Sequence, residues 1–512
     1  MKLSMDMVTS ISVCTAEDMN WEGGGNCLVV PLYRKEFPLN SALLQEEEEL
    51  VLQALVDREV LTGAAGTCYY LPAPSRPYSG VLVLGLGDRK KATAESLRRA
   101  VGKAASLLKA NRVERIGVDL VHFPELPVPA FVESLNLAQY RFDTYKKEEE
   151  KPAPAVREVV LVVADSVDKA ALLEAAERAA FFSVAANGAR HLANTASNDM
   201  TPAVLAAAAQ KIAEEGGEQC TCAVLDQQRM EELGMNALLG VARGSGKPPQ
   251  LICLEYTHPE ATRTITLVGK GVTFDTGGIS LKPGAKMHEM KFDMCGAAVV
   301  LATMMAVTRL KPVLNVISVV PAVENMPDGN AQTPGEIVRA CNGKTIEVLN
   351  TDAEGRLILA DALAYAVDTW KPDCIVDLAA LTGAVVIALG HVAAGVVGSD
   401  SALVQSLVAA GESTGERLWE LPLWEDYEEM MEGTFADLSN IGPEREAGTI
   451  TGAAFLKAFT GDTPWAHIDI AGVSYGIRNK PYLKPEYATG FGVRLLLEWL
   501  TGRTAQSGQA SE

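Results

Sequence analysis

The sequence contains few of the side chains that hold a zinc finger or a disulfide framework together. Its six histidines and nine cysteines form no set with zinc-finger spacing. Cys220 and Cys222 stand one residue apart, and without further ligands nearby this spacing indicates a chance pair rather than a soft-metal site. An odd number of scattered cysteines favours free thiols in a reducing cytosol over disulfides, which predicts a cytoplasmic protein.

Long apolar segments and positive charge are also scarce. No stretch reaches about 18 uninterrupted apolar residues, and the start, Met1–Met7, lacks the basic and apolar parts of a targeting signal. We therefore expect no membrane partner. The net charge of −20 argues against nucleic acid as a partner, because a broad phosphate-binding surface needs clustered Lys and Arg. A local basic patch is still compatible with this total.

The 512 residues are enough for two or three domains, and the hydrophobic pattern divides them into two α/β parts. We predict a smaller N-terminal α/β domain at 1–165, a linking helix within 166–195, and a larger domain at 196–512. The charged, proline-rich run 146–154 is the best linker candidate, and 501–512 is a small, polar tail. Strands are predicted in the first domain at 27–33, 81–86, 116–121 and 158–164, with a helix at 92–110 and the linking helix at 168–194.

The larger domain alternates between strand-like and helical segments. Strands are predicted at 251–256, 264–268, 313–320, 374–378 and 393–398. Helices are predicted at 297–309, 335–341 and 357–369, and Thr201-Pro202 has the pattern of an N-cap and first turn. This alternation favours a mainly parallel central sheet flanked by helices, with functional residues beyond the carboxyl ends of its strands.

The most informative segment is Asn350–Leu357, which places two carboxylates and one cation two residues apart. In an extended or looped backbone such residues point the same way, so Asp352, Glu354 and Arg356 would face one site. A solvated salt bridge is the alternative explanation for this segment alone. A glycine-rich segment upstream favours a shared site over a solvated salt bridge.

That upstream segment places charged residues among apolar ones. Lys270, Asp275, Lys282 and Asp293 follow a strand-like run and lie among Gly, Val, Phe, Ile and Met. Charges in such surroundings are usually paired or bound to a metal. With Asp352 and Glu354, the aspartates provide carboxylate oxygens that suit Mg, Mn or Zn and can bridge two ions about 3.5–4 Å apart. For Lys270, an ion pair with one of the aspartates is the alternative.

These segments resemble the leucyl (cytosol) aminopeptidase family. The match is close at 350–357, 268–282 and 290–298, and it continues more loosely over most of 190–495. The resemblance implies that the larger domain is catalytic and removes the N-terminal residue, preferably Leu and other apolar residues, from short peptides. It implies two Mn²⁺ or Zn²⁺ ions per subunit, with a water between them as the nucleophile. The ligands carried over by position are Lys270, Asp275, Asp293, Asp352 and Glu354.

The same resemblance assigns non-metal roles to Lys282 and Arg356. Lys282 would stabilise the developing oxyanion, an effect worth about 3–4 kcal/mol for a single donor. Arg356 has the planar fork to hold a bicarbonate ion as a proton shuttle. Lys270 can be a ligand only as a neutral amine, a form that burial and neighbouring dications favour. The implied substrate pocket comprises Met290, Ala380, Leu381 and Gly383.

Ala380 departs from the family pattern, which commonly has threonine there, so the preference among substrate side chains stays open. The family further implies a homohexamer, a dimer of trimers. Two alternatives to a simple enzyme are a family member with an added DNA-binding or regulatory role, and a non-catalytic structural oligomer. Two other motifs are not assigned to the site. Gly343-Lys344-Thr345 lacks the glycine of a P-loop at Val338, and His467 is interpreted as a structural histidine.

Overall fold

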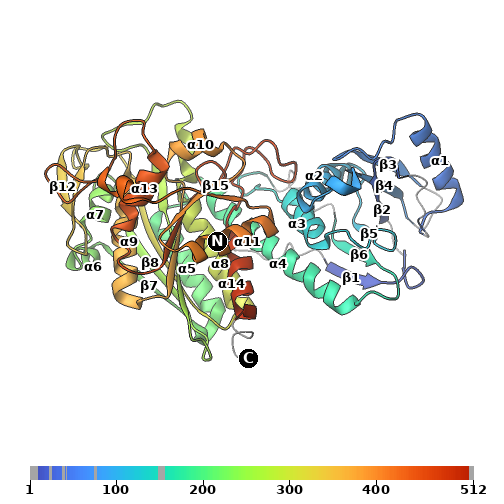
Figure 1. Ribbon diagram of the computed structural model, residues 1–512, viewed down its shortest axis with the longest axis horizontal. Coiled ribbons are helices and arrows are strands. Elements are labelled where there is room, and N and C mark those ends of the chain that lie inside the picture. The colour runs from blue at the N-terminus through green and yellow to red at the C-terminus, as the bar shows by residue number, and fades with distance from the viewer. Residues whose placement is uncertain are drawn as a thin grey trace. The chain divides into compact units, whose positions relative to one another are not determined.

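The structure is a computed structural model that describes residues 10–21, 26–36, 41, 43–73, 78–147 and 156–506 (Figure 1). The chain forms two compact units. Of the described residues, the larger unit comprises Gly188–Ile477 and Pro485–Gln506, and the smaller unit comprises those from Ser10 to Asn187 together with Arg478–Lys484. Most of the predicted linker at 146–154 and the last six residues of the predicted tail lie outside the described residues.

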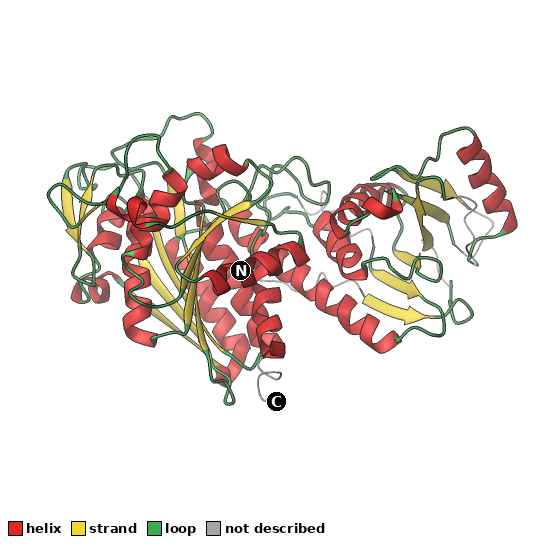
Figure 2. Cartoon of the chain, viewed as in Figure 1, coloured by secondary structure: helices red, strands yellow, loops and turns green. Residues whose placement is uncertain are grey.

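The smaller unit is a sheet of order β1-β6-β5-β2-β4-β3 with helices beside it (Figure 2). Neighbouring strands are parallel except β3 and β4. Its elements are β1 (Ser10–Cys14), β2 (Asn26–Tyr33), α1 (Glu46–Asp57), β3 (Cys68–Pro72), β4 (Gly80–Gly87), α2 (Ala94–Ala110), β5 (Arg115–Asp119), α3 (Val128–Gln139) and β6 (Glu158–Val162). The predicted strands and helix are confirmed. Helix α2 begins two residues later than predicted, because the Thr93 hydroxyl accepts a hydrogen bond from Ser96 N and caps it.

The larger unit is built on a nine-stranded sheet of order β16-β15-β18-β14-β9-β11-β8-β7, with β10 paired to β11. The centre is parallel, whereas β7, β8 and β15 pair antiparallel with their neighbours on at least one side. The strands are β7 (Cys220–Leu225), β8 (Gln250–Tyr256), β9 (Thr264–Gly269), β10 (Gly271–Asp275), β11 (Asn315–Asn325), β14 (Cys374–Ala379), β15 (Ala394–Gly398), β16 (Leu418–Glu420) and β18 (Trp465–Asp469).

Helices cover both faces of this sheet, as the alternating pattern predicts. Helices α5 and α8 pack on one face, with α14 against α8, while α7, α9 and α13 pack on the other (Figure 1). Helix α4 (Lys169–Asn194) belongs to the smaller unit up to Asn187 and to the larger unit after it. The other helices of the larger unit are α5 (Pro202–Gly216), α6 (Gln227–Glu232), α7 (Asn236–Ala242), α8 (Cys295–Leu310), α9 (Glu354–Trp370), α10 (Gly383–Leu389), α11 (Ser401–Thr414), α12 (Glu425–Glu429), α13 (Gly448–Lys457) and α14 (Val493–Gln506).

The predicted helix at 335–341 is wrong. This segment is strand β12 (Glu336–Arg339), which pairs antiparallel with β13 (Thr345–Val348); β13 in turn pairs with β17 (Leu438–Ser439). Side-chain burial in this segment alternates from one residue to the next, as in a strand, rather than with a helical period: Ile337 is 48% exposed and Val338 is 9% exposed. Gly343, with φ at +91°, forms the turn of this hairpin, which accounts for the Gly-Lys-Thr sequence without a phosphate site.

One apolar helical segment, Met287–Leu310, is long enough to cross a membrane by composition, but 89% of its most apolar window is buried within the fold. It joins a 3-10 helix, η4 (Met287–Met294), to α8. Because α8 packs on β9, β11 and β14, its apolar surface is accounted for as the core of the larger unit.

Candidate metal centre

The carboxyl ends of neighbouring parallel strands bring the two sequence motifs together. Lys270 directly follows β9, Asp275 is the last residue of β10, and Ala380 follows β14. Asp293 lies near the end of η4, and Glu354 is the first residue of α9. The structure thus places residues from both motifs at one edge of the sheet, where sites in such folds form.

Lys270 is at the centre of this cluster and is almost completely buried. Its Nζ lies 2.8 Å from Asp293 Oδ1 and 2.8 Å from Glu354 Oε1. It also donates to the carbonyl oxygen of Ala380 at 3.0 Å. The ion pair that the sequence left open as an alternative for Lys270 is therefore formed in this structure.

Lys282 and Asp275 form the second half of the cluster. Lys282 Nζ lies 2.8 Å from Asp275 Oδ2 and 2.5 Å from Asp352 Oδ1. The Asp275 carboxylate also accepts hydrogen bonds from Gly277 N and from the Asn325 side chain, at 2.8 and 2.9 Å. Unlike Lys270, the Lys282 side chain is 23% exposed, so its ammonium borders the solvent side of the cluster.

The cluster has the chemistry of a divalent-cation site. Ligand oxygens of Asp275, Asp293 and Glu354 all lie within 4.8 Å of one another. Asp293 Oδ2 and Glu354 Oε2 are buried and have no hydrogen-bond partner among the described residues. An unpartnered buried carboxylate oxygen is costly, and the ion pairs join four carboxylates to only two ammonium groups. Hard oxygens with excess negative charge fit Mg, Mn or Zn.

The pKa directions show the same imbalance of charge. Burial raises the pKa of Asp293 well above its usual range; Lys270 opposes this shift, and Glu354 and Asp275 add to it. Burial alone would lower the pKa of Lys270, but the charges of Asp293 and Glu354 outweigh burial and raise it. The neighbouring carboxylates therefore keep the Lys270 amine protonated. For Lys270 to act as a ligand, a bound cation would have to displace this proton.

Gly355, within the first motif, leaves room for Lys270. A Cβ at this position would lie 2.6 Å from Lys270 Cε and 2.8 Å from its Nζ. Gly355→Ala should therefore displace the lysine, lower the free energy of unfolding by about 1–3 kcal/mol and weaken Mn²⁺ binding. Denaturant unfolding and calorimetric titration of the metal-free protein measure the two effects. Gly246→Ala is the control, since its Cβ would meet nothing within 4 Å, and equal effects in both variants would contradict this account.

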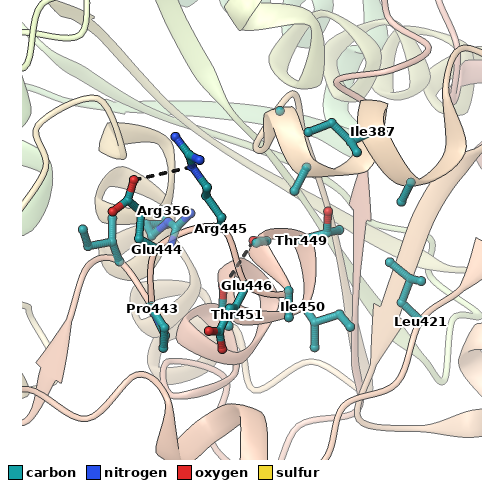
Figure 3. A pocket seen from close by; sticks show the side chains of 17 residues that line it. Arg356, Ile387, Leu421, Pro443, Glu444, Arg445, Glu446, Thr449, Ile450 and Thr451 are labelled. Atoms are coloured by element: carbon teal, nitrogen blue, oxygen red, sulfur yellow. Dashed lines mark hydrogen bonds and ion pairs between the residues drawn. The ribbon is translucent and has the colours of Figure 1, made fainter.

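Arg356 lies beside the cluster and lines a cavity of about 830 Å³ (Figure 3). Its Nη1 donates to Asn440 O at 2.9 Å, whereas its buried Nε has no partner among the described residues. Burial lowers its pKa to about 10, so the guanidinium stays charged at neutral pH. The other walls are mostly apolar and include Ile387 of α10 and Leu421, with Glu444, Arg445 and Glu446 among the remaining lining residues.

The four residues implied for a substrate pocket do not all reach this cavity. Gly383 lines it, whereas Met290 lies in η4 and is not among the lining residues. Ala380 contributes its carbonyl to Lys270, and the half-buried Leu381 donates its N–H to Asp469.

Sequence reasoning missed Asn325. This residue pairs in register with Asp275, and its side chain donates to both Asp275 and Thr351 O, so it ties the two motifs together. The predicted strand 313–320 stops short of Asn325, whereas β11 runs on to this residue, so a longer strand prediction was the one signal that could have placed it at the edge of the sheet.

Comparisons with known proteins agree with this geometry. Models of the cytosol aminopeptidase family match residues 187–497 for the catalytic domain and 29–149 for the N-terminal domain. A probable cytosol aminopeptidase of Syntrophotalea carbinolica is 43% identical, over 93% of this chain and 96% of its own. One of Geobacter sulfurreducens is 44% identical, over 91% and 95%. The structure is similar to the bottromycin maturation enzyme BotP in complex with Mn, with a TM-score of 0.81 and 32% identity, over 94% of this chain and 100% of that one.

Proposed function

The chain belongs to the cytosol aminopeptidase family, and from this premise we propose that it is a two-metal aminopeptidase that removes N-terminal residues, preferably Leu and other apolar residues, from short peptides. The observation that carries the proposal is the buried carboxylate cluster around Lys270, in which one oxygen each of Asp293 and Glu354 has no hydrogen-bond partner in the part of the chain that the structure describes. We propose the domain division at 1–165, 166–195 and 196–512 for the same chain.

The metal ligands in this proposal are Lys270, Asp275, Asp293, Asp352 and Glu354. Bound Mn²⁺ or Zn²⁺ would acidify a water molecule and polarise the scissile carbonyl. Lys282, on the solvent side, is placed to donate an N–H to the oxyanion as it develops. The Nε–H of Arg356, which has no partner within the described ranges, is available to a small planar anion, and this supports bicarbonate as the group that accepts and returns the proton.

The simplest test of this function is release of N-terminal leucine from Leu-containing dipeptides and tripeptides. The protein as isolated should cleave them, lose activity in a chelator, and recover it with Mn²⁺ or Zn²⁺. A fully chelated sample that cleaves leucine amide at the original rate would remove the metal-dependent mechanism.

We propose that the part of the peptide beyond the scissile bond occupies the cavity beside Arg356, because its walls are mostly apolar and Arg356, which lines it, follows the cluster residue Glu354 by two positions in α9. Ile387 is 90% exposed and faces this cavity from α10 (Figure 3). Ile387→Asp should raise KM for Leu-Phe amide by about tenfold, or about 1.4 kcal/mol, and leave leucine amide nearly unchanged. Val392→Asp is the control, since Val392 is exposed but does not line the cavity. Equal KM changes for both substrates would contradict this placement.

We further propose that the protein acts in the cytoplasm as a homohexamer, without a membrane or nucleic-acid partner. Sedimentation should then show a species roughly six times the subunit mass of 54.5 kDa. A single species at the subunit mass would contradict the assembly.

A further inference from the structure

Asp469, at the carboxyl end of β18, is fully buried and accepts three hydrogen bonds. Leu381 N and Ala471 N each donate to its Oδ1 at 3.1 Å, and the Thr382 hydroxyl donates to its Oδ2 at 2.6 Å. All three donors are uncharged groups, and two of them belong to the turn at 381–382. The turn must keep its conformation, because without these hydrogen bonds the buried carboxylate would be left unsatisfied.

Thr382 connects this carboxylate to helix α10. A hydroxyl has one donor and two acceptor positions, and the short bond to Asp469 takes the donor. The oxygen can then accept from Val385 N, at 3.3 Å, which caps α10, and from the Thr449 hydroxyl, at 3.0 Å, at the start of α13. A single hydroxyl thus fixes the entry of α10, whose next residues line the cavity.

The same turn supplies the third acceptor of Lys270. The carbonyl of Ala380, one residue before Leu381, accepts from Lys270 Nζ at 3.0 Å. A carbonyl oxygen can only accept, so it restricts how the amine rotates whether that amine carries three N–H groups or two. The direction of the Lys270 amine is therefore coupled to the shape of the turn.

We propose that Asp469 is a positioning residue: through Leu381 N–H and the Thr382 hydroxyl it fixes the Ala380 carbonyl, and this carbonyl orients Lys270 toward the divalent cations. The inference rests on the proposed metal site, in which Lys270 is a ligand. It assigns a role to Asp469 and Thr382. None of the hydrogen bonds described above joins either residue directly to the carboxylate cluster, so both would act through the turn.

The test compares Thr382→Val, which removes the hydroxyl, with Thr382→Ser, which keeps it. Calorimetric titration of the metal-free protein with Mn²⁺ is the main readout. Thr382→Val and Asp469→Asn should weaken Mn²⁺ binding about tenfold or more, as is usual for residues that orient ligands, and Thr382→Ser should stay within about twofold of the parent. Activity of Thr382→Val should also keep rising at Mn²⁺ concentrations that saturate the parent.

Thr201→Val is a matched control for a purely structural role. Thr201 caps α5 in the same unit and also accepts from the third residue of its helix, Val204 N, at 3.3 Å. Both valine variants should lose thermal stability, but only Thr382→Val should lose Mn²⁺ affinity. If Thr382→Val does not fold, Asp469→Asn is compared with Asp400→Asn, since Asp400 caps α11.

Equal Mn²⁺ affinities in Thr382→Val and Thr201→Val would overturn the positioning role while leaving the aminopeptidase intact. A parent protein that binds no Mn²⁺ would overturn the proposed metal site itself. The double variant Thr382→Val/Asp469→Asn should bind Mn²⁺ with the same affinity as the weaker-binding of the two single variants, because the two residues act as one unit. Full additivity would contradict their action through the same turn.

Discussion

Glu354→Gln should lower kcat for leucine peptides on the order of a thousandfold, with Mn²⁺ binding reduced at the same time. Glu354 is buried, with Oε1 paired to Lys270 at 2.8 Å and Oε2 unpartnered among the described residues. Glutamine has the same size, but it removes one negative charge and turns one oxygen into a donor group. The cluster then lacks one of the carboxylate ligands of the proposed metal site.

Steady-state kinetics at saturating Mn²⁺ and metal analysis of the purified variant test this result. Glu425→Gln, an exposed residue of α12, is the control and should match the parent in both measurements. A Glu354→Gln variant with parental kcat would show that the carboxylate cluster is a structural ion-pair network.

Lys282→Met should lower kcat about 100- to 1000-fold and change KM by only a few fold. Its ammonium is held between Asp275 Oδ2 and Asp352 Oδ1, and it is partly exposed, so it can reach an oxyanion next to the cations. A donor that acts on charge developing in the transition state affects kcat more than substrate binding. Methionine keeps most of the apolar stem while removing the charge.

Lys286→Met is a suitable control for Lys282→Met, because Lys286 is exposed on the same loop and should tolerate the change. The outcome that excludes the oxyanion role is a large rise in KM with kcat preserved. Loss of bound Mn²⁺ would instead show that Lys282 maintains the ligands.

The sequence was sufficient for much of this site because strand ends and local spacing place it. Lys270 lies at the edge because it follows the strand predicted at 264–268, whereas Asp275 is placed there by β10, a strand that the sequence analysis did not predict. Helix α9 begins at Glu354, three residues earlier than predicted, so Glu354 and Arg356 project from a first helical turn rather than from a loop. That these residues bind metal remains a prediction.

Features that depend on which strands are neighbours could not be predicted from spacing. Asn325 and Asp469 become part of the site because β11 lies beside β10 and β18 beside β14. The pairing of Asp377 Oδ1 with buried His467 Nδ1 at 2.6 Å, which agrees with a structural role for His467, has the same origin. These partners are 50 to 90 residues apart in the sequence, so no local pattern predicts their contact.

The antiparallel pairings of β7, β8 and β15 could not be predicted from the sequence either, because an apolar strand has the same residue pattern whether it runs parallel or antiparallel to its neighbour. The helix predicted at 335–341 was wrong because only Ile337 and Val338 lie between the charged Glu336 and Arg339, and so short an apolar run fits a strand as well as a helix. Both cases reflect tertiary pairing that overrides weak local preference.

The most direct test of the central claim is the anomalous scattering of crystals grown with Mn²⁺. The account predicts two peaks beside the carboxylates of Asp275 and Glu354, about 3.5–4 Å apart, with Lys270 Nζ as a ligand of one of them. Crystals in which Lys270 keeps its ion pairs with Asp293 and Glu354, and in which no peak lies between these side chains, would contradict it.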